Sequence, residues 1–396
     1  MKKYITFLRE HKTIRGLSLV NFIASFGAWF STVAIYTMVV NFGSSELAIA
    51  VVIAMHFIPA IIIAPLSGAI IDRVKIKPLM TLLLIIELCM TIMFLTINSI
   101  EFLWLLLIFI FIRMSAGSMY FSSEMSLLAK LVSGKELQLA NEINSIIWSF
   151  TYAVGMATSG FIVNLYGIKV AIFIDVCIFI LAILIFSSIK IEIKYEKVTE
   201  RILKLMQDGL IYIKNNKIIL YLIILHASVG LTSYDALITI LAKNEYKEII
   251  AVPLAIGLSN AIRAIALMIG PMFLSRVINI NNLHYLLLFQ GFTIMLWALV
   301  QKDFYIALGA LFLVGFSTAF LWSYTYALLQ NRCDKKYLGR VISYNDMFFM
   351  LVHVLTTLFI GVMAKFTTPT IITLCLGVAF VGFAYYYTKI IKYIRG

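Results

Sequence analysis

Long apolar stretches alternate with short polar connections along the whole chain, and this pattern predicts its secondary structure. A helix crosses the bilayer core, about 30 Å thick, with about 20 apolar residues, and twelve stretches are close to that length. They are expected near residues 16–41, 46–71, 78–97, 102–128, 139–164, 168–189, 217–242, 250–275, 283–300, 304–330, 340–365 and 369–388. The pattern therefore predicts an all-α membrane protein with twelve transmembrane helices.

The connection after the sixth stretch divides the chain into two halves. Apolar residues recur in it at roughly helical spacing: Ile202, Leu205, Gly209, Leu210 and Ile213. Because charges of both signs lie between them, we expect an amphipathic helix at the membrane surface. The expected domains are an N-terminal six-helix bundle over 1–189, a cytosolic amphipathic linker over 190–216 and a C-terminal six-helix bundle over 217–396.

Matching residues in the two halves indicate an internal duplication. Leu127, Leu128, Leu137 and Asn144 correspond to Leu328, Leu329, Leu338 and Asn345. These residues lie at equivalent topological places, which favours duplication over chance similarity. Two pseudo-symmetric bundles of this kind are typical of secondary transporters.

Composition and charge agree with a membrane protein and indicate its orientation. The mean hydropathy is +1.00, and 62% of the residues are hydrophobic while 13% are charged, whereas soluble domains have about 45–50% apolar and about 25% charged residues. The net charge of +13 raises nucleic acid as a partner, but 25 of the 32 basic residues fall in alternate connections and at the two termini. Such a bias places these regions in the cytosol. We expect a multi-pass protein of the bacterial cytoplasmic (inner) membrane, with both termini cytosolic and no nucleic-acid partner.

Several kinds of chemistry have no sequence support. The four cysteines show no metal-type spacing, and three of them lie within apolar stretches: Cys89, Cys177 and Cys375. The sequence has no nucleotide-binding loop, catalytic triad or dinucleotide fingerprint. We expect no enzyme activity, no cofactor and no metal. The first apolar stretch is too long for a signal peptide and is expected to be an uncleaved span.

Three motifs carry a resemblance to a known family. Gly68, Asp72, Arg73 and Lys77 are spaced as in the signature between crossings two and three of the major facilitator superfamily, although Lys75 and Ile76 replace a glycine and a basic residue. Arg113 and Gly117 resemble the motif of its fourth crossing. The segment from Gly155 to Gly160 resembles the antiporter glycine motif, with Met156 in place of the usual proline.

Further segments resemble one branch of that superfamily. They lie at the start of crossing one (Arg15, Leu17, Asn21, Ser25, Phe26, Gly27, Trp29), before crossing five (Glu136, Leu137, Ala140, Asn141) and before crossing eleven (Leu338, Gly339, Arg340, Val341). Together they are similar to the efflux branch that includes macrolide exporters and the enterobactin exporter. Members of this branch often have an acidic residue where this chain has Ala28, so another carboxylate must carry a coupling proton.

The resemblance implies alternating access between two bundles by an antiporter. The expected function is proton-coupled efflux of an amphipathic small molecule, such as a drug or a secreted metabolite like a siderophore. The expected partners are the lipid bilayer, the small-molecule substrate and protons, and the protein is expected to be a monomer. The alternatives are uptake or facilitated diffusion of a polar nutrient or lysolipid, and a non-transporting membrane sensor or scaffold.

Ionisable residues at membrane depth are the candidates for proton coupling, because an unpaired charge there costs at least about 2.5–3.5 kcal/mol. The candidates are Asp235, Asp346, Arg113 and His226. Arg113 is expected either to sense the proton or to act as a static hydrogen-bond anchor. His226 is expected either to titrate or to be a satisfied packing residue. Asp175 is expected to have a structural role.

Two further groups are expected to serve conformational switching and substrate binding. The switch candidates are Gly68, Asp72, Arg73, Lys77 and Arg340, with Asp72 accepting hydrogen bonds from the start of crossing eleven. The alternative for Asp72 is a solvated loop acid. The substrate-cavity candidates are Asn21, Trp29, Arg263, Trp322, Tyr324, Tyr326 and His353. For the aromatic members of this group, packing within the bundles is the alternative.

Overall fold

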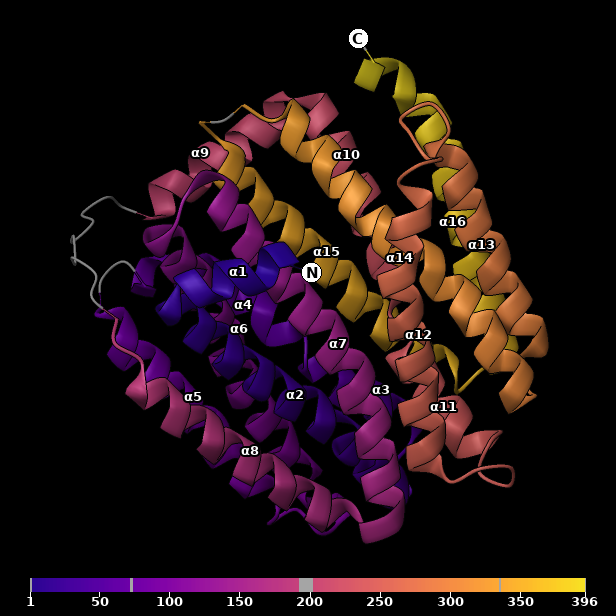
Figure 1. The fold of residues 1–396 in the computed structure, drawn as a ribbon. Helices are drawn as coiled ribbons and strands as arrows, with labels where there is room; N and C mark the ends of the chain where they lie inside the picture. Colours follow the sequence, from indigo (N-terminus) through magenta and orange to yellow (C-terminus); the bar gives the residue numbers. More distant parts are fainter. Residues whose placement is uncertain (1, 72–73, 192–201, 335, 396) are drawn as a thin grey trace. The chain divides into compact units, whose positions relative to one another are not determined.

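The computed structural model describes residues 2–71, 74–191, 202–334 and 336–395 (Figure 1). Over these residues the chain is helical, with no strand. The α-helices are α1 (Lys2–Glu10), α2 (Lys12–Asn41), α3 (Glu46–Met55), α4 (Ile58–Ile71), α5 (Ile76–Phe94), α6 (Leu103–Leu131), α7 (Gly134–Tyr166), α8 (Ile168–Ser188), α9 (Ile202–Asn215), α10 (Lys217–Ala227), α11 (Asp235–Asn244), α12 (Val252–Leu274), α13 (Leu283–Val300), α14 (Phe304–Arg332), α15 (Leu338–Met363) and α16 (Pro369–Arg395). Two short 3₁₀ helices are η1 (Ile100–Phe102) and η2 (Ser228–Thr232).

Twelve spans long and apolar enough to cross a membrane are found within the described residues, which confirms the expected number and the all-α class. Ten of them are single α-helices, one of which is extended at its start by η1. The other two, Glu46–Ile63 and Lys217–Asn244, are each interrupted near the middle. Both interruptions have a local cause in the sequence.

The second span is interrupted between α3 and α4. Pro59 has no backbone N–H and its ring clashes with the preceding turn, so a continuous helix is disfavoured there. The chain tightens instead, and the amides of His56 and Phe57 donate to the carbonyls of Ile53 and Ala54 at 3.1 and 2.9 Å. The His56 ring Nδ1 also lies 3.0 Å from the Val52 carbonyl oxygen, so the polar groups at this break are paired.

The seventh span is interrupted between α10 and α11 by η2. Gly230 lies in η2, where an added Cβ would be 2.7 Å from the Phe349 carbonyl oxygen and 2.8 Å from the His353 amide. Only glycine allows this close approach to α15. The interruption places Asp235 in the first turn of α11, where the exposed amides of a helix N-terminus favour a negative charge.

The helices form two compact units, each of which is described separately. The first unit contains residues 1–43 and 59–199, and the second contains 44–58 and 200–396. In the first unit α2 packs against α7 and α8, and α5 packs against α6 and α8. In the second, α12 packs on α14, α13 on α16, and α15 on α3 and η2. The bundle boundaries expected from the sequence stay a prediction.

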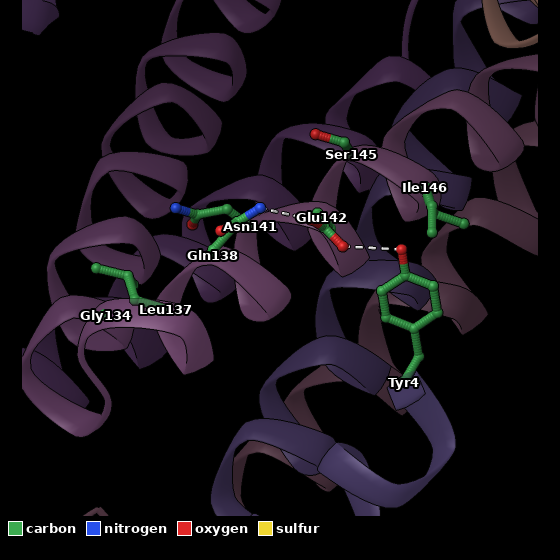
Figure 2. A pocket seen from close by; sticks show the side chains of 8 residues that line it. All are labelled: Tyr4, Gly134, Leu137, Gln138, Asn141, Glu142, Ser145 and Ile146. Atoms are coloured by element: carbon green, nitrogen blue, oxygen red, sulfur yellow. Dashed lines mark hydrogen bonds between the residues drawn. The ribbon is translucent and has the colours of Figure 1, made fainter. Parts of the chain in front are cut away.

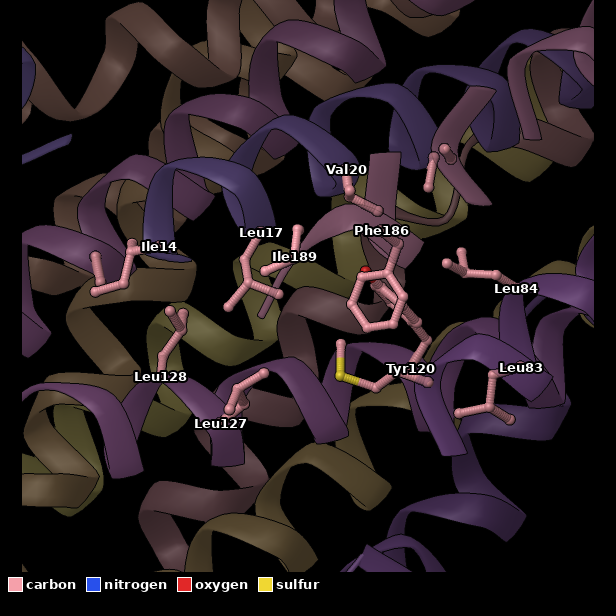
Figure 3. Close-up of a cluster of buried hydrophobic side chains, with 14 of the residues drawn as sticks. Ile14, Leu17, Val20, Leu83, Leu84, Tyr120, Leu127, Leu128, Phe186 and Ile189 are labelled. Atoms are coloured by element: carbon pink, nitrogen blue, oxygen red, sulfur yellow. The ribbon is translucent and has the colours of Figure 1, made fainter. Parts of the chain in front are cut away.

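A cluster of buried apolar side chains occupies the interior of the first unit (Figure 3). It joins α2, α5, α6, α7 and α8, and Leu17, Leu84, Leu127 and Phe186 are completely buried in it. Each of these helices has an apolar face turned to its neighbours and another exposed on the unit's surface, as Leu82, Trp104 and Phe173 are. Because lipid is as apolar as a protein core, both faces can be apolar in a membrane.

Candidate functional site

Arg113 forms a buried ion pair in the first unit. Its Nη2 donates to Asp175 Oδ2 on α8 at 2.8 Å, and its Nη1 donates to the Ser31 hydroxyl on α2 at 2.8 Å. The side chain of Arg113 is 4% exposed and that of Asp175 is 0% exposed. The guanidinium also lies over the rings of Phe94 and Phe179, at 5.5 and 5.1 Å from their centroids. These contacts link α6 to α2 and α8 within the first unit.

Two glycines make room for the carboxylates beside Arg113. An added Cβ at Gly27 would overlap Asp175 Oδ1, and one at Gly117 would lie 3.4 Å from Glu87 Oε2. Glu87 is 7% exposed, on α5, and it interacts electrostatically with both Arg113 and Asp175. Each of these residues stands out separately in the sequence, but nothing in the sequence indicates that they form one cluster. Gly27 and Gly117 are the sequence features that could have indicated this cluster, because a glycine within an apolar helix leaves room for a neighbouring side chain.

A second buried ion pair lies in the second unit. Arg263 Nη2 on α12 donates to Asp235 Oδ1 on α11 at 3.2 Å, and the two side chains are 11% and 8% exposed. The Arg263 guanidinium lies 5.8 Å from the ring centroid of Tyr234. His353 of α15 interacts electrostatically with Arg263. The structure thus brings together a coupling candidate and two substrate-cavity candidates, Asp235, Arg263 and His353.

Three further candidates of the second unit, His226, Trp322 and Tyr326, form an aromatic cluster together with Phe349. The His226 ring lies 5.6 Å from Trp322, 5.4 Å from Tyr326 and 5.5 Å from Phe349, measured between ring centroids. His226 Nδ1 is 2.8 Å from the Thr325 hydroxyl. Trp322 and Tyr326 stack at 5.0 Å, and Trp322 is 40% exposed. This arrangement offers ring faces together with polar atoms at their edges.

Asp346 lies beside this aromatic cluster. The Asn345 amide donates to Asp346 Oδ1 at 3.3 Å, and the Tyr326 hydroxyl is a further polar neighbour of the carboxylate. Asp346 therefore has neutral hydrogen-bond donors around it, whereas Asp235 has a cation. The two carboxylates proposed for coupling are held in chemically different ways.

Three other substrate-cavity candidates have separate surroundings. Asn21 accepts a hydrogen bond from Ser25 at 2.8 Å in the interior of the first unit. Trp29 packs against Trp148 and Tyr152 of α7, with centroid distances of 5.8 and 4.5 Å. Tyr324, in the second unit, stacks on Phe320 at 5.4 Å. Within its own unit, each is engaged with neighbouring side chains rather than grouped with the other candidates.

Three of the five switch candidates, Gly68, Lys77 and Arg340, lie within the residues that the structure describes. Gly68 lies in α4, and Asp72 and Arg73 lie outside the described residues, as does any contact they make. Lys77 Nζ donates to the carbonyls of Ser187 and Ile189 at 3.1 and 2.6 Å, which binds α5 to the C-terminal end of α8. Arg340, in the first turn of α15, lies 3.8 Å from Asp208 of the linker helix α9.

An open hollow of about 640 Å³ lies beside the N-terminal helix and the first half of α7 (Figure 2). Glu142 on its wall accepts hydrogen bonds from Tyr4 at 2.8 Å, from Lys3 at 2.9 Å and from Gln138 at 3.0 Å. None of the predicted site residues lines this hollow. Elsewhere in the described chain, no group of three or more histidine, cysteine or acidic residues is placed to hold a metal ion.

The chain was compared with protein-family models, with curated protein sequences and with solved structures. Residues 17–357 match the family model described as Major Facilitator Superfamily. No curated protein sequence gives a significant match. Among solved structures, the nucleoside transporter NupG has 14% identity and a TM-score of 0.72, covering 96% of this chain and 100% of that one.

Two other solved structures are similar over almost the whole chain. A bacterial homologue of the iron transporter ferroportin, in an inward-facing state, has 15% identity and a TM-score of 0.69, covering 95% of this chain and 98% of that one. The peptide transporter POT has 11% identity and a TM-score of 0.71, covering 95% of this chain and 94% of that one. At these identities the likeness concerns the fold.

Proposed function

Because the chain belongs to the Major Facilitator Superfamily, we propose that it is a proton-coupled exporter of an amphipathic small molecule in the bacterial cytoplasmic membrane. Family membership and the fold make it a multi-pass membrane transporter rather than an enzyme. The direction, the substrate class and the coupling ion are the added steps of the proposal. Each is supported by different residues.

The ion pair between Asp235 and Arg263 is the observation that supports coupling. A buried pair is strongly destabilised when one partner loses its charge, because the other charge is left without compensation. Protonation of Asp235 would have this effect on Arg263, and it would therefore change which conformation of the second unit is favoured. One proton moved down the membrane potential provides about 2.3 kcal/mol per 100 mV, so such a coupling can drive export against a gradient.

The aromatic cluster around His226 supports an amphipathic substrate. Trp322 and Tyr326 present stacked ring faces, and Trp322 is 40% exposed. Aromatic faces bind apolar groups and cations, and their polar edges offer hydrogen bonds. The similarity of crossings one, five and eleven to the efflux branch supports the outward direction.

A reconstitution experiment tests the proposal. A ligand-stabilisation screen of the purified protein against drugs, siderophores, sugars and lysolipids first identifies a compound that raises its thermal unfolding temperature. That compound is then assayed in proteoliposomes with and without an imposed pH gradient. We expect transport to require the gradient, and equal transport in both conditions would refute proton coupling.

A matched pair of variants tests the role assigned to Asp235. Asp235→Asn is expected to abolish gradient-driven transport while exchange of substrate across the membrane continues. Asp303→Asn is the control, because Asp303 accepts from the Ile306 amide at the start of α14 at 3.0 Å and asparagine caps a helix about as well. If both variants transport as the wild type does, Asp235 does not carry the coupling proton.

Uptake of a polar nutrient is the competing function. The similar structures include transporters of nucleosides and peptides, so the fold is compatible with polar substrates. A deletion strain separates the two: export predicts retention of, or hypersensitivity to, a compound, and uptake predicts loss of growth on a nutrient. A sensor or scaffold would keep its activity in Arg113→Ala and Asp235→Asn variants that still fold.

A further inference from the structure

Glu124 is a buried carboxylate that the proposed mechanism does not use. It lies on α6 and is 1% exposed. Neither of its side-chain oxygens has a hydrogen-bond partner among the described residues, and no lysine, arginine or histidine there forms an ion pair with it. Asp175, in the same unit and equally buried, is paired with Arg113 at 2.8 Å. Glu124 therefore stands out as an acid without a counter-charge.

The surroundings of Glu124 are apolar with a few neutral polar groups. Tyr120 precedes it by one helical turn, and Leu127 and Leu128 follow it by one turn; all three belong to the apolar cluster of the first unit (Figure 3). The side-chain amides of Asn21 on α2 and Asn144 on α7 are its polar neighbours.

Other unpartnered polar atoms are grouped with this acid. The Tyr120 hydroxyl and the Asn144 amide nitrogen are also buried without hydrogen bonds within the described chain. Glu87 of α5 is a second acid that interacts electrostatically with Tyr120. Buried polar groups are almost always paired, so a cluster of unpaired ones calls for a functional explanation.

The matching place in the second half of the chain has no acid. Thr325 corresponds to Glu124 by the same spacing that relates Asn144 to Asn345. Thr325 is paired, since its hydroxyl lies 2.8 Å from His226 Nδ1 and donates to the Leu321 carbonyl at 2.7 Å. A neutral, hydrogen-bonded residue thus suffices for packing at this position of the fold, and packing alone does not account for a carboxylate.

An ionised carboxylate in such a place is costly, since burial removes its hydration and no cation replaces it. A proton removes the charge reversibly. We propose that Glu124 is a second proton-binding carboxylate of the transport cycle, located in the first unit; this rests on the proposed proton-coupled function. The neutral acid can donate its O–H to the amide oxygen of Asn21 or Asn144. The ionised form can accept from Asn144 and Tyr120 when the proton leaves to water.

Infrared difference spectroscopy of the purified protein tests this assignment without a substrate. Spectra at stepwise increasing pH report loss of the C=O stretching band of protonated carboxylic acids. We expect one component of that band to be absent from Glu124→Gln and present in the wild type. The matched control is Glu142→Gln, which removes an acid on α7 that is held by Lys3 and Tyr4 at the open hollow and should leave the component unchanged.

Further variants make each outcome decisive. Glu124→Asp keeps a carboxyl group and should shift the frequency of the band component assigned to Glu124 rather than abolish it. This variant replaces Glu124→Gln in the test if Glu124→Gln does not fold. Identical spectra of wild type and Glu124→Gln would overturn the proposal. A change in the pH midpoint of this band when sodium replaces choline at constant ionic strength would also overturn it, because sodium would then be the ion that binds at the site. If transport did not depend on the proton gradient while the Glu124 band component was present, proton-coupled transport would be refuted but proton binding by Glu124 would not.

Discussion

Arg113 on α6 and Asp175 on α8 are joined by a 2.8 Å hydrogen bond in the interior of the first unit, where both side chains are almost completely buried. The pair connects two helices that are far apart in the sequence. Gly27 on α2 leaves the space that Asp175 occupies. If Arg113 is a static anchor, removing either partner of the pair has a measurable consequence for stability.

Removing either partner of this pair should destabilise the protein strongly. Breaking a buried ion pair costs about 3–5 kcal/mol because the remaining charge is left uncompensated. Arg113→Met and Asp175→Leu are each expected to lower the midpoint of thermal unfolding in detergent, and the double variant should recover most of the loss. Single variants as stable as the wild type, or a double variant with the summed loss, would contradict the anchor role.

The close approach of α12 and α14 should not tolerate a side chain at Gly270. An added Cβ there would overlap the carbonyl oxygen of Phe316, so Gly270→Ala must push the two helices apart. Overpacking of this kind costs about 1–3 kcal/mol. The measurement is the thermal unfolding midpoint of purified protein.

Gly309→Ala, on α14, is the matched control for that substitution. Nothing lies within 4 Å of a Cβ built at Gly309, and alanine is favoured over glycine in a helix by up to about 1 kcal/mol. This variant should be as stable as the wild type or slightly more stable. Equal destabilisation by both substitutions would mean that the loss does not come from the close approach of α12 and α14 at Gly270.

Cys333 should react slowly with water-soluble maleimides near neutral pH. It lies just beyond the end of α14 and is 8% exposed, and burial raises the pKa of its thiol. Because the thiolate is the reactive form, the labelling rate should increase as the pH rises toward that raised pKa. Cys333→Ser should remove this labelling. A rate at neutral pH equal to that of free glutathione would contradict the burial.

The orientation in the membrane can be tested with reporter fusions. The charge bias predicts a cytosolic C-terminus, so a green fluorescent protein fused after Gly396 should be fluorescent, whereas alkaline phosphatase fused there should be inactive. A fusion at Lys365, in a loop expected outside, should give the opposite result. The same result at both positions, or the reverse pattern, would refute the predicted topology.

Several features could be predicted from local sequence because their physical causes are local. The length of each apolar stretch sets the number of spans, since a bilayer requires about 20 apolar residues per helix. Arg113 and Asp235 could be singled out because a charge at membrane depth needs compensation. Pro59 could have indicated the break in the second span, although the apolar length of residues 46–71 predicted one continuous helix.

The partners of those charges depended on which helices meet. Arg113 pairs with a residue 62 positions away and Arg263 with one 28 positions away, and no periodicity specifies such contacts. Glu124 lies near the end of the fourth apolar stretch, and only packing against α2 and α7 shows it as buried and unpaired.

The sequence by itself determined the class of this protein, its twelve crossings and the family to which it belongs. These follow from apolar length, from the distribution of basic residues and from short motifs, all of which act locally or through the membrane. Tertiary structure alone decided which buried charges are compensated. That outcome depends on the side chains that neighbouring helices bring within about 4 Å, because an ionised group in an apolar interior is stable only when an opposite charge or hydrogen-bond donors lie next to it.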